Sequence, residues 1–302
     1  MNLLTRSDFD GLACAAILRD IGVIGSWKFV HPKDIQDGIV TVTADDILAN
    51  VPYVEGCGMW FDHHVSEEER LGSLDFQFEG AVEYLDSAAH VIYNYFKGKH
   101  DLSKFDEMIE AVDKVDAAKL SSQDILHPEG WILLGYIMDP RTGLGRFRDF
   151  RISNYQLMEK LIDLCRLQGI QEIMQDPDVQ ERVSVYGQQT ELFADMLKTR
   201  THTKGNVIVT DLRNVDTIYA GNRFMVYALF PEQNISMWIV DGRDKLNCPI
   251  AVGYSIINHS ATVNVGSVLL SYGGGGHKQV GTCQVDYDDA DKVIAELVEK
   301  LQ

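Results

Sequence analysis

Proline and basic residues are scarce in this sequence of 302 residues. With only 7 prolines and 45% hydrophobic residues, it is neither collagen-like, mucin-like nor wholly disordered. Lys and Arg number 27 against 45 Asp and Glu, so the formal charge is −18, most of it in residues 1–200. Such a chain offers few side chains that neutralise phosphates, so we do not expect it to bind long duplex DNA.

Paired cysteines and long apolar runs are also absent. The five cysteines are scattered and form no CxxC motif, which favours free thiols over a disulfide framework. No apolar run approaches the ~20 residues of a membrane-spanning helix, and the acidic residue Asp8 lies close to the start of the sequence. We therefore expect a soluble cytoplasmic protein with no membrane contact.

Short apolar runs typical of strands alternate with longer segments of helical character. Strands are expected at residues 2–5, 27–30, 39–43, 47–51 and 59–61, and helices at 12–21, 88–96, 104–120 and 131–138. This alternation predicts an α/β fold with a mostly parallel N-terminal sheet and helices on both of its faces. Ligands of such sheets bind beyond the carboxyl ends of the strands.

The length and a change of pattern predict two domains, since a domain has about 150 residues. We expect a first domain at residues 1–175, a helical linker at 176–204, and a smaller C-terminal α/β domain at 205–302, with a cleft between the two domains. Within the last domain, strands are expected at residues 206–210, 224–230, 236–240 and 250–256.

The tripeptide Asp62-His63-His64 directly follows the expected strand 59–61. Histidine is a common metal ligand, and where the backbone bends at a strand end one ring can bind a metal while the other contacts a substrate. The alternative is a surface tripeptide without a function.

Two carboxylates, Asp8 and Asp10, stand in the loop after the first expected strand, and Gly11 lets the chain turn into the helix. They could donate oxygens to neighbouring cations. Alternatively, they serve as the N-cap and first-turn acidic residues of that helix.

Four consecutive glycines, Gly273, Gly274, Gly275 and Gly276, precede His277. Helix or strand propensity does not explain the run, because each glycine costs about 1 kcal/mol in an ordinary element. Its amides could approach an anion, with His277 as a further partner for a phosphate. The alternative is a flexible linker.

Together these motifs, with the first one extended to Thr5–Gly11 (TRSDFDG), resemble the DHH family of phosphoesterases with its DHH-associated C-terminal domain. The resemblance covers essentially the whole chain and is strongest to the exopolyphosphatase-like members. Nanoribonucleases and RecJ-type exonucleases are more distant. It implies a manganese-dependent hydrolase, with Mg²⁺ as the other candidate ion, whose first domain holds the metals and whose last domain binds the substrate.

The resemblance also implies roles for individual residues. His64 would contact the scissile phosphate and Asp62 would orient the site. The implied metal ligands are Asp8, Asp10, His63 and Asp116, with Asp113 as the alternative to Asp116.

Two positions depart from the family pattern. Arg6, or Leu4 in a longer spacing of the motif, stands where the family usually has a metal-binding histidine, and Asn50 stands where it has a bridging aspartate. Asp45 or Asp46 would supply that carboxylate only if residues 39–43 formed the relevant strand. The site could therefore hold one ion rather than two, with Asn50 as a weak ligand, or Arg6 could hold a phosphate in place of an ion.

The expected substrates are small phosphorylated molecules: short single-stranded oligonucleotides, phosphonucleotides or polyphosphate. The glycine run, His277, Arg223 and Arg141 would hold the non-reacting phosphates. Aromatic residues such as Tyr272 or Tyr254 stacked on a base would favour nucleotides over polyphosphate. A homodimer is a further expectation. The alternative function is a catalytically weakened protein that binds phosphates or nucleotides.

Overall fold

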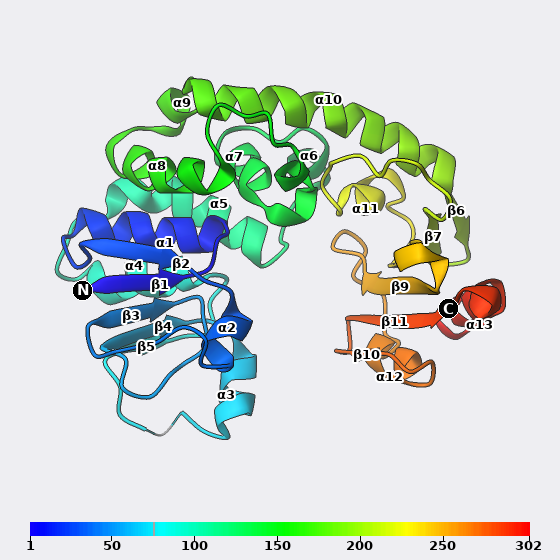
Figure 1. Ribbon diagram of the computed structural model, residues 1–302, viewed down its shortest axis with the longest axis horizontal. Coiled ribbons are helices and arrows are strands. Elements are labelled where there is room, and N and C mark those ends of the chain that lie inside the picture. Colours follow the sequence, from blue (N-terminus) through cyan, green and yellow to red (C-terminus); the bar gives the residue numbers. More distant parts are fainter. Residues whose placement is uncertain (75) are drawn as a thin grey trace. The chain divides into compact units, whose positions relative to one another are not determined.

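The computed structural model describes residues 1–74 and 76–302 (Figure 1). These residues form two compact units. Unit 1 comprises Met1–Lys119, Pro128–Pro140 and Leu144–Ser184, and unit 2 comprises Leu120–His127, Arg141–Gly143 and Val185–Gln302. In the part of the chain that is described, no helix combines the length and apolar character needed to span a bilayer.

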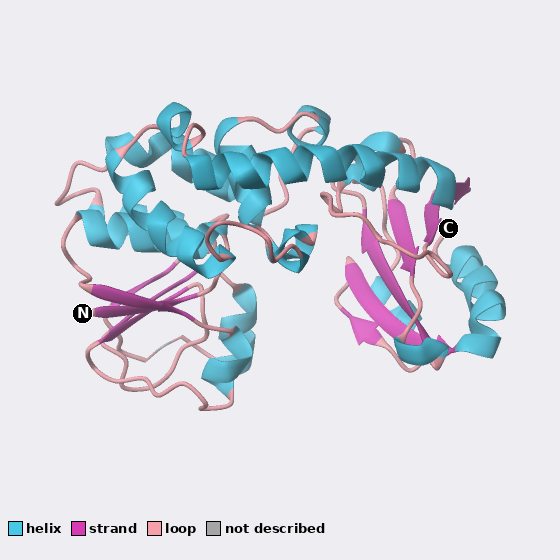
Figure 2. Ribbon diagram, turned by 45° about the horizontal axis from the view of Figure 1, so that its top comes forward, coloured by secondary structure: helices cyan, strands magenta, loops and turns pink. Residues whose placement is uncertain are grey.

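The sheet of unit 1 is parallel, as predicted, with the strand order β2-β1-β3-β4-β5, labelled in Figure 1. Its strands are drawn as magenta arrows near the N-terminus in Figure 2. Strands β3 and β4 are buried along their whole length, which is typical of parallel strands covered on both faces. The strands are β1 (Asn2–Thr5), β2 (Ser26–Phe29), β3 (Asp46–Ala49), β4 (Met59–Asp62) and β5 (Gly80–Val82).

Both faces of this sheet are covered. Leu4, Leu48 and Trp60 are neighbours across the strands and pack with Ile35 of α2. On the opposite face Phe61 contacts aromatic rings of α4, and α1 packs against α4, α5 and α8. The helices of unit 1 are α1 (Phe9–Asp20), α2 (Pro32–Gln36), α3 (Val65–Leu71), α4 (Ala88–Phe96), α5 (Asp106–Asp116), α7 (Gly130–Met138), α8 (Asn154–Leu167), α9 (Ile170–Ile173) and the first part of α10 (Pro177–Arg200).

Unit 2 contains a mixed sheet with the strand order β10-β11-β9-β8-β7-β6. Its core lies between this sheet and the helices α12 and α13. The strands are β6 (Thr201–Lys204), β7 (Val207–Asp211), β8 (Ile235–Ile239), β9 (Asn247–Tyr254), β10 (Gly275–Gly276) and β11 (Val280–Asp286). The helices are α6 (Ser122–Leu126), α11 (Met225–Leu229), α12 (Val265–Leu270) and α13 (Ala290–Lys300).

Two predicted strands were wrong, and one strand was missed. Residues 39–43 form no strand, because the Asp46 carboxylate accepts hydrogen bonds from the amide and hydroxyl of Thr43 and turns the chain into β3. The apolar run 224–230 contains α11 instead of a strand, with the Asn222 side chain accepting from the amide of Phe224. A short apolar run cannot by itself distinguish a strand from a buried helix. The polar edge strand β6 was missed.

Candidate metal centre

The predicted metal-binding motifs follow the carboxyl ends of neighbouring parallel strands. Asp8 and Asp10 follow β1, Asn50 follows β3, and Asp62 ends β4. Because these strands are parallel, their carboxyl ends share one edge of the sheet. Asp116, at the end of α5, joins the group from the helical layer.

Asp10 is a deeply buried carboxylate, with 1% of its surface exposed. Its two oxygens accept hydrogen bonds from the amides of Ala88 (3.0 Å) and Ala89 (2.7 Å), so the N-terminus of α4 orients it. Burial raises the pKa of Asp10 well above its ordinary value, and the charges of Asp116 and Asp8 raise it further. A bound cation would offset this repulsion.

His63 presents one ring nitrogen to two carboxylates. Its Nδ1 lies 3.2 Å from the carbonyl oxygen of Leu85, which can only accept, so Nδ1 carries the proton. Its Nε2 lies 3.3 Å from Oδ2 of Asp116 and 3.9 Å from Oδ2 of Asp10. This buried nitrogen forms no hydrogen bond with the residues that the structure describes. Burial lowers the pKa of His63, and the neighbouring His64 lowers it further.

A neutral His63 therefore directs a lone pair towards two carboxylates, which is repulsive unless a cation lies between them. Ligand atoms of Asp10, His63 and Asp116 all lie within 4.8 Å of one another. A nitrogen and carboxylate oxygens are ligands that suit Mn²⁺. These three residues fit a divalent metal ion.

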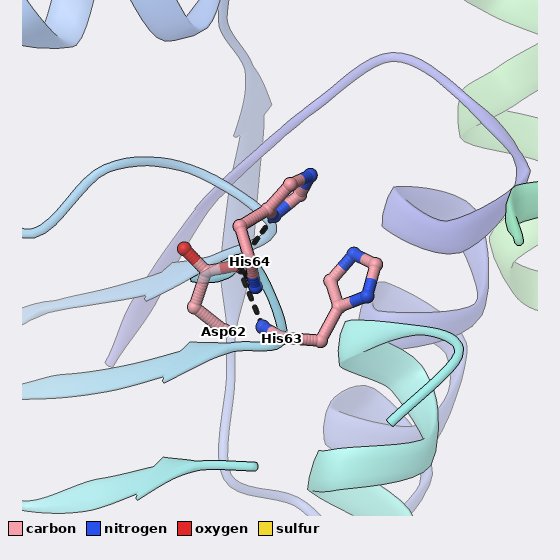
Figure 3. Close-up of side chains that lie close together, drawn as sticks. All are labelled: Asp62, His63 and His64. Atoms are coloured by element: carbon pink, nitrogen blue, oxygen red, sulfur yellow. Dashed lines mark hydrogen bonds and ion pairs between the residues drawn. The ribbon is translucent and has the colours of Figure 1, made fainter. Parts of the chain in front are cut away.

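Asp62 is a buried carboxylate that shapes the chain after β4. Its Oδ1 accepts hydrogen bonds from the amide of His63 (2.7 Å) and from Nδ1 of His64 (2.7 Å), drawn as dashed lines in Figure 3. The rings of His63 and His64 point in different directions in that view. The bond from Asp62 raises the pKa of His64. Asp62 thus holds the ring of His64 and the backbone of His63, and its role as an orienting residue stays a prediction.

Asp8 lies in a different environment from Asp10. It is the N-cap of α1. Its Oδ1 accepts hydrogen bonds from the backbone amide of Gly11 (2.9 Å) and from the side-chain Nδ2 of Asn50 (3.2 Å). Its Oδ2 lies 3.0 Å from Nε of Arg6. A side chain at Gly11 would overlap the carbonyl oxygen of Arg6, so this close approach requires glycine. The structure thus pairs the predicted ligand Asp8 with Arg6 and Asn50.

The N-terminus of α4 is a part of the site whose role the sequence reasoning missed. Asp113 accepts a hydrogen bond from the hydroxyl of Ser87 (2.6 Å) and lies 2.7 Å from Nδ1 of His90. Ser87 is the N-cap of α4, the helix whose first amides bind Asp10. Of the two candidates on α5, Asp116 lies near His63, whereas Asp113 is bound to α4.

The glycine run of unit 2 has a packing reason. A side chain on Gly274 would overlap the carbonyl oxygen of Thr282, and one on Gly276 would overlap that of Val280. The amides of Gly274 and His277 donate to the carbonyls of Leu269 (3.0 Å) and Val280 (2.8 Å). The hairpin β10–β11 and α12 therefore already use these two amides. Phosphate binding by the run stays a prediction.

Arg141 and Arg223 both lie in unit 2, although the sequence separates them. Near them, the amide of Gly221, two residues before Arg223, donates a hydrogen bond of 2.9 Å to the carbonyl of Thr142, which follows Arg141. The Arg223 guanidinium lies 4.1 Å from the ring centre of Phe224. The two loops that contain Arg141 and Arg223 are thus joined by a backbone hydrogen bond.

Comparison with known proteins agrees with the motifs. The solved structure of the pGpG-specific phosphodiesterase PggH from Vibrio cholerae is 42% identical, with a TM-score of 0.90 over 99% of this chain and 98% of that chain. An exopolyphosphatase-related protein from Bacteroides fragilis is 11% identical, with a TM-score of 0.52 over 99% of this chain and 91% of that one. RecJ from Thermus thermophilus is 15% identical, with a TM-score of 0.51 over 99% of this chain and 48% of RecJ. No family model and no curated protein matches the sequence.

The chain belongs to the DHH family of phosphoesterases, which confirms the resemblance drawn from its motifs. Within that family it is similar over its full length to PggH, whereas the other two likenesses show the fold alone. Membership of this family confirms the expectation that the protein is a phosphoesterase, and hence a hydrolase.

Proposed function

We propose that this protein is a divalent-metal-dependent phosphodiesterase that hydrolyses a short linear guanosine dinucleotide, pGpG, to two molecules of GMP. The observation that carries the proposal of metal-dependent hydrolysis is the group formed by Asp10, His63 and Asp116, where a histidine lone pair faces two carboxylates. Support for the substrate is the 42% identity to PggH across both units.

Asp10, His63 and Asp116 would hold the metal. A divalent ion bound there supplies positive charge beside the scissile phosphate and lowers the pKa of a water molecule. The protein's own contribution is to hold the ligands in place: α4 amides orient Asp10, and the Leu85 carbonyl fixes the proton on Nδ1 of His63.

His64 is placed to act on the phosphate. Its Nδ1 is bound to Asp62, which raises the pKa of His64 and favours the protonated ring. The ring lines a cavity of about 180 Å³ together with Arg6 and Asn50. A protonated His64 donates a hydrogen bond to a phosphate oxygen in this cavity, or a proton to the departing 3′ oxygen.

The test is hydrolysis by the purified protein with Mn²⁺, an ion with which RecJ from Thermus thermophilus was solved. The substrates are pGpG, GpG, pApA, a longer oligoribonucleotide and polyphosphate. We expect GMP from pGpG at the highest kcat/KM. Preference for polyphosphate or the longer oligonucleotide would contradict the substrate and favour the exopolyphosphatase or oligoribonuclease type. Binding of pGpG without turnover in Mn²⁺ or Mg²⁺ would favour the alternative of a weakened nucleotide-binding protein.

The remaining expectations belong to the same proposal. Arg141, Arg223, His277 and the glycine run would hold the phosphates and bases that do not react. The protein would act in the cytoplasm, as a homodimer, on free small substrates. Sedimentation of the purified protein tests the dimer directly.

A further inference from the structure

Asp8 and Asp10 are two residues apart, but their carboxylates have different neighbours. Asp10 faces the Nε2 lone pair of His63 and the carboxylate of Asp116, so it lies among metal-ligating atoms. Asp8 faces nitrogens that carry hydrogen: the Gly11 amide, the Asn50 side-chain amide and Arg6 Nε. Amide N–H groups and guanidinium nitrogens do not bind divalent ions.

The Arg6 guanidinium stands close enough to Asp8 to exclude a second ion there. Nε of Arg6 lies 3.0 Å from Oδ2 of Asp8, the distance of a charge-assisted hydrogen bond. A divalent ion on the same carboxylate would be placed beside a permanent positive charge. Asn50, the next polar side chain along this edge, is neutral and donates its own amide to Asp8.

Asn50 adds a buried hydrogen-bond acceptor to this half of the site. It is 2% exposed, and its φ of 56° holds it in the left-handed conformation directly after β3. Its Oδ1 is buried and accepts no hydrogen bond from the residues that the structure describes. Such an orphaned acceptor is costly without a ligand that donates to it, such as a hydroxyl or amino group of a nucleotide.

The Arg6 side chain also reaches the cavity next to the metal-ligating residues. It is 42% exposed, and it lines the cavity of about 180 Å³ with Asn50, Asp62 and His64. Since Nε is directed to Asp8, the rest of the guanidinium has donors for an anion. Arg6 and His64 can donate to a phosphate group in this cavity, and the carboxylates that also line it are already paired, Asp62 with His64 and Glu67 with Arg70.

We propose that the guanidinium of Arg6 is the second positive centre of this site, so that each chain binds one divalent ion, and that Arg6 holds a non-bridging phosphate oxygen of the substrate. This inference rests on the proposed function, because the phosphate is that of the dinucleotide. In this site Asp8 positions Arg6, and Asp10, His63 and Asp116 bind the ion.

The first test counts metal ions, so it needs no turnover. Equilibrium dialysis against Mn²⁺, with the bound metal measured by elemental analysis and native mass spectrometry, is expected to give one ion per wild-type chain. Arg6→His, which removes the guanidinium and adds a ligand beside Asp8, is expected to bind a second ion. Two ions of similar affinity in the wild type overturn the inference. No bound ion in the wild type overturns the proposed function instead.

The second test measures phosphate binding. With the Mn²⁺-loaded protein, Arg6→Gln is expected to weaken binding of inorganic phosphate about tenfold or more, because a charge-assisted hydrogen bond is lost. Arg6→Lys should weaken it less, because the charge remains. The matched control is Arg19→Gln on α1, whose guanidinium is bound to Asp163. Unchanged phosphate affinity in Arg6→Gln, with Mn²⁺ still bound, overturns the role of Arg6.

Discussion

The metal site of unit 1 and the glycine hairpin of unit 2 are both marked by sequence motifs, but they are built in opposite ways. Around β1 and β4, polar groups are buried without full compensation: Nε2 of His63 has no hydrogen-bond partner among the described residues, and the pKa of Asp10 is raised. In the hairpin, the amides of Gly274 and His277 are hydrogen-bonded, and two glycines are required by packing.

This contrast shows that a sequence motif indicates a ligand site when its buried polar atoms lack hydrogen-bond partners within the protein. Polar atoms that are buried and lack a partner cost stability, so a fold retains them where a ligand or a reaction uses them. Glycines that fill a close backbone contact need no ligand to explain them. Substitutions in the metal site should therefore impair activity, and substitutions in the hairpin should impair stability.

The largest expected effect is that of Asp116→Asn in the metal site. Hydrolysis of pGpG with Mn²⁺ should fall more than about a hundredfold, since even residues that only orient metal ligands contribute about 10–100-fold. Stability without metal should not decrease, because the change removes a negative charge near Asp10. Steady-state kinetics and thermal unfolding measure the two effects.

The control for that variant is Asp106→Asn, an isosteric change at the other end of the same helix α5. It should leave kcat within a few-fold of the wild type. Similar losses of activity in the two variants would break the assignment of Asp116 to the metal site.

Metal should stabilise the wild-type protein through unit 1. At an Mn²⁺ concentration a hundred times the Kd, we expect about 2.7 kcal/mol of added stability. Urea unfolding of the EDTA-treated protein with and without Mn²⁺ measures this gain. The gain should be lost in Asp116→Asn, and an equal gain in that variant would place the ion elsewhere.

The hairpin offers a matched pair of glycines. Gly274→Ala should destabilise the protein by about 1–3 kcal/mol, because the new methyl group overlaps the Thr282 carbonyl. Gly275→Ala meets no atom within 4 Å and should cost less. Urea unfolding measures the stability of both variants. Equal losses of stability would mean that packing does not explain the glycine run.

The smallest expected effect is that of Ser87→Ala, which should change both stability and activity. Ser87→Ala removes the N-cap of α4 and should cost about 1 kcal/mol. Because amides at that end hold Asp10, kcat should fall a few-fold, with KM for pGpG little changed. A change confined to KM would show that α4 contacts the substrate rather than positioning the ligand.

Much of the site was predictable because its residues follow strands in recognisable motifs. The apolar runs of β1 and β4 locate Asp8, Asp10 and the DHH tripeptide at one edge of the sheet. The choice between Asp113 and Asp116 was not predictable, since the two lie one turn apart on the same helix. It depends on Ser87 and His90 of α4, which bind Asp113.

Local pattern alone determined most strands and helices of unit 1, the family, and the polar residues at the strand ends, because hydrophobic periodicity and short motifs are properties of neighbouring residues. Only the tertiary structure decided which nitrogen of His63 faces the carboxylates, and that Asp8 pairs with Arg6 while Asp10 does not. These contacts join β1, β4 and α5, so they exist only once the parallel sheet and its helical layer have assembled.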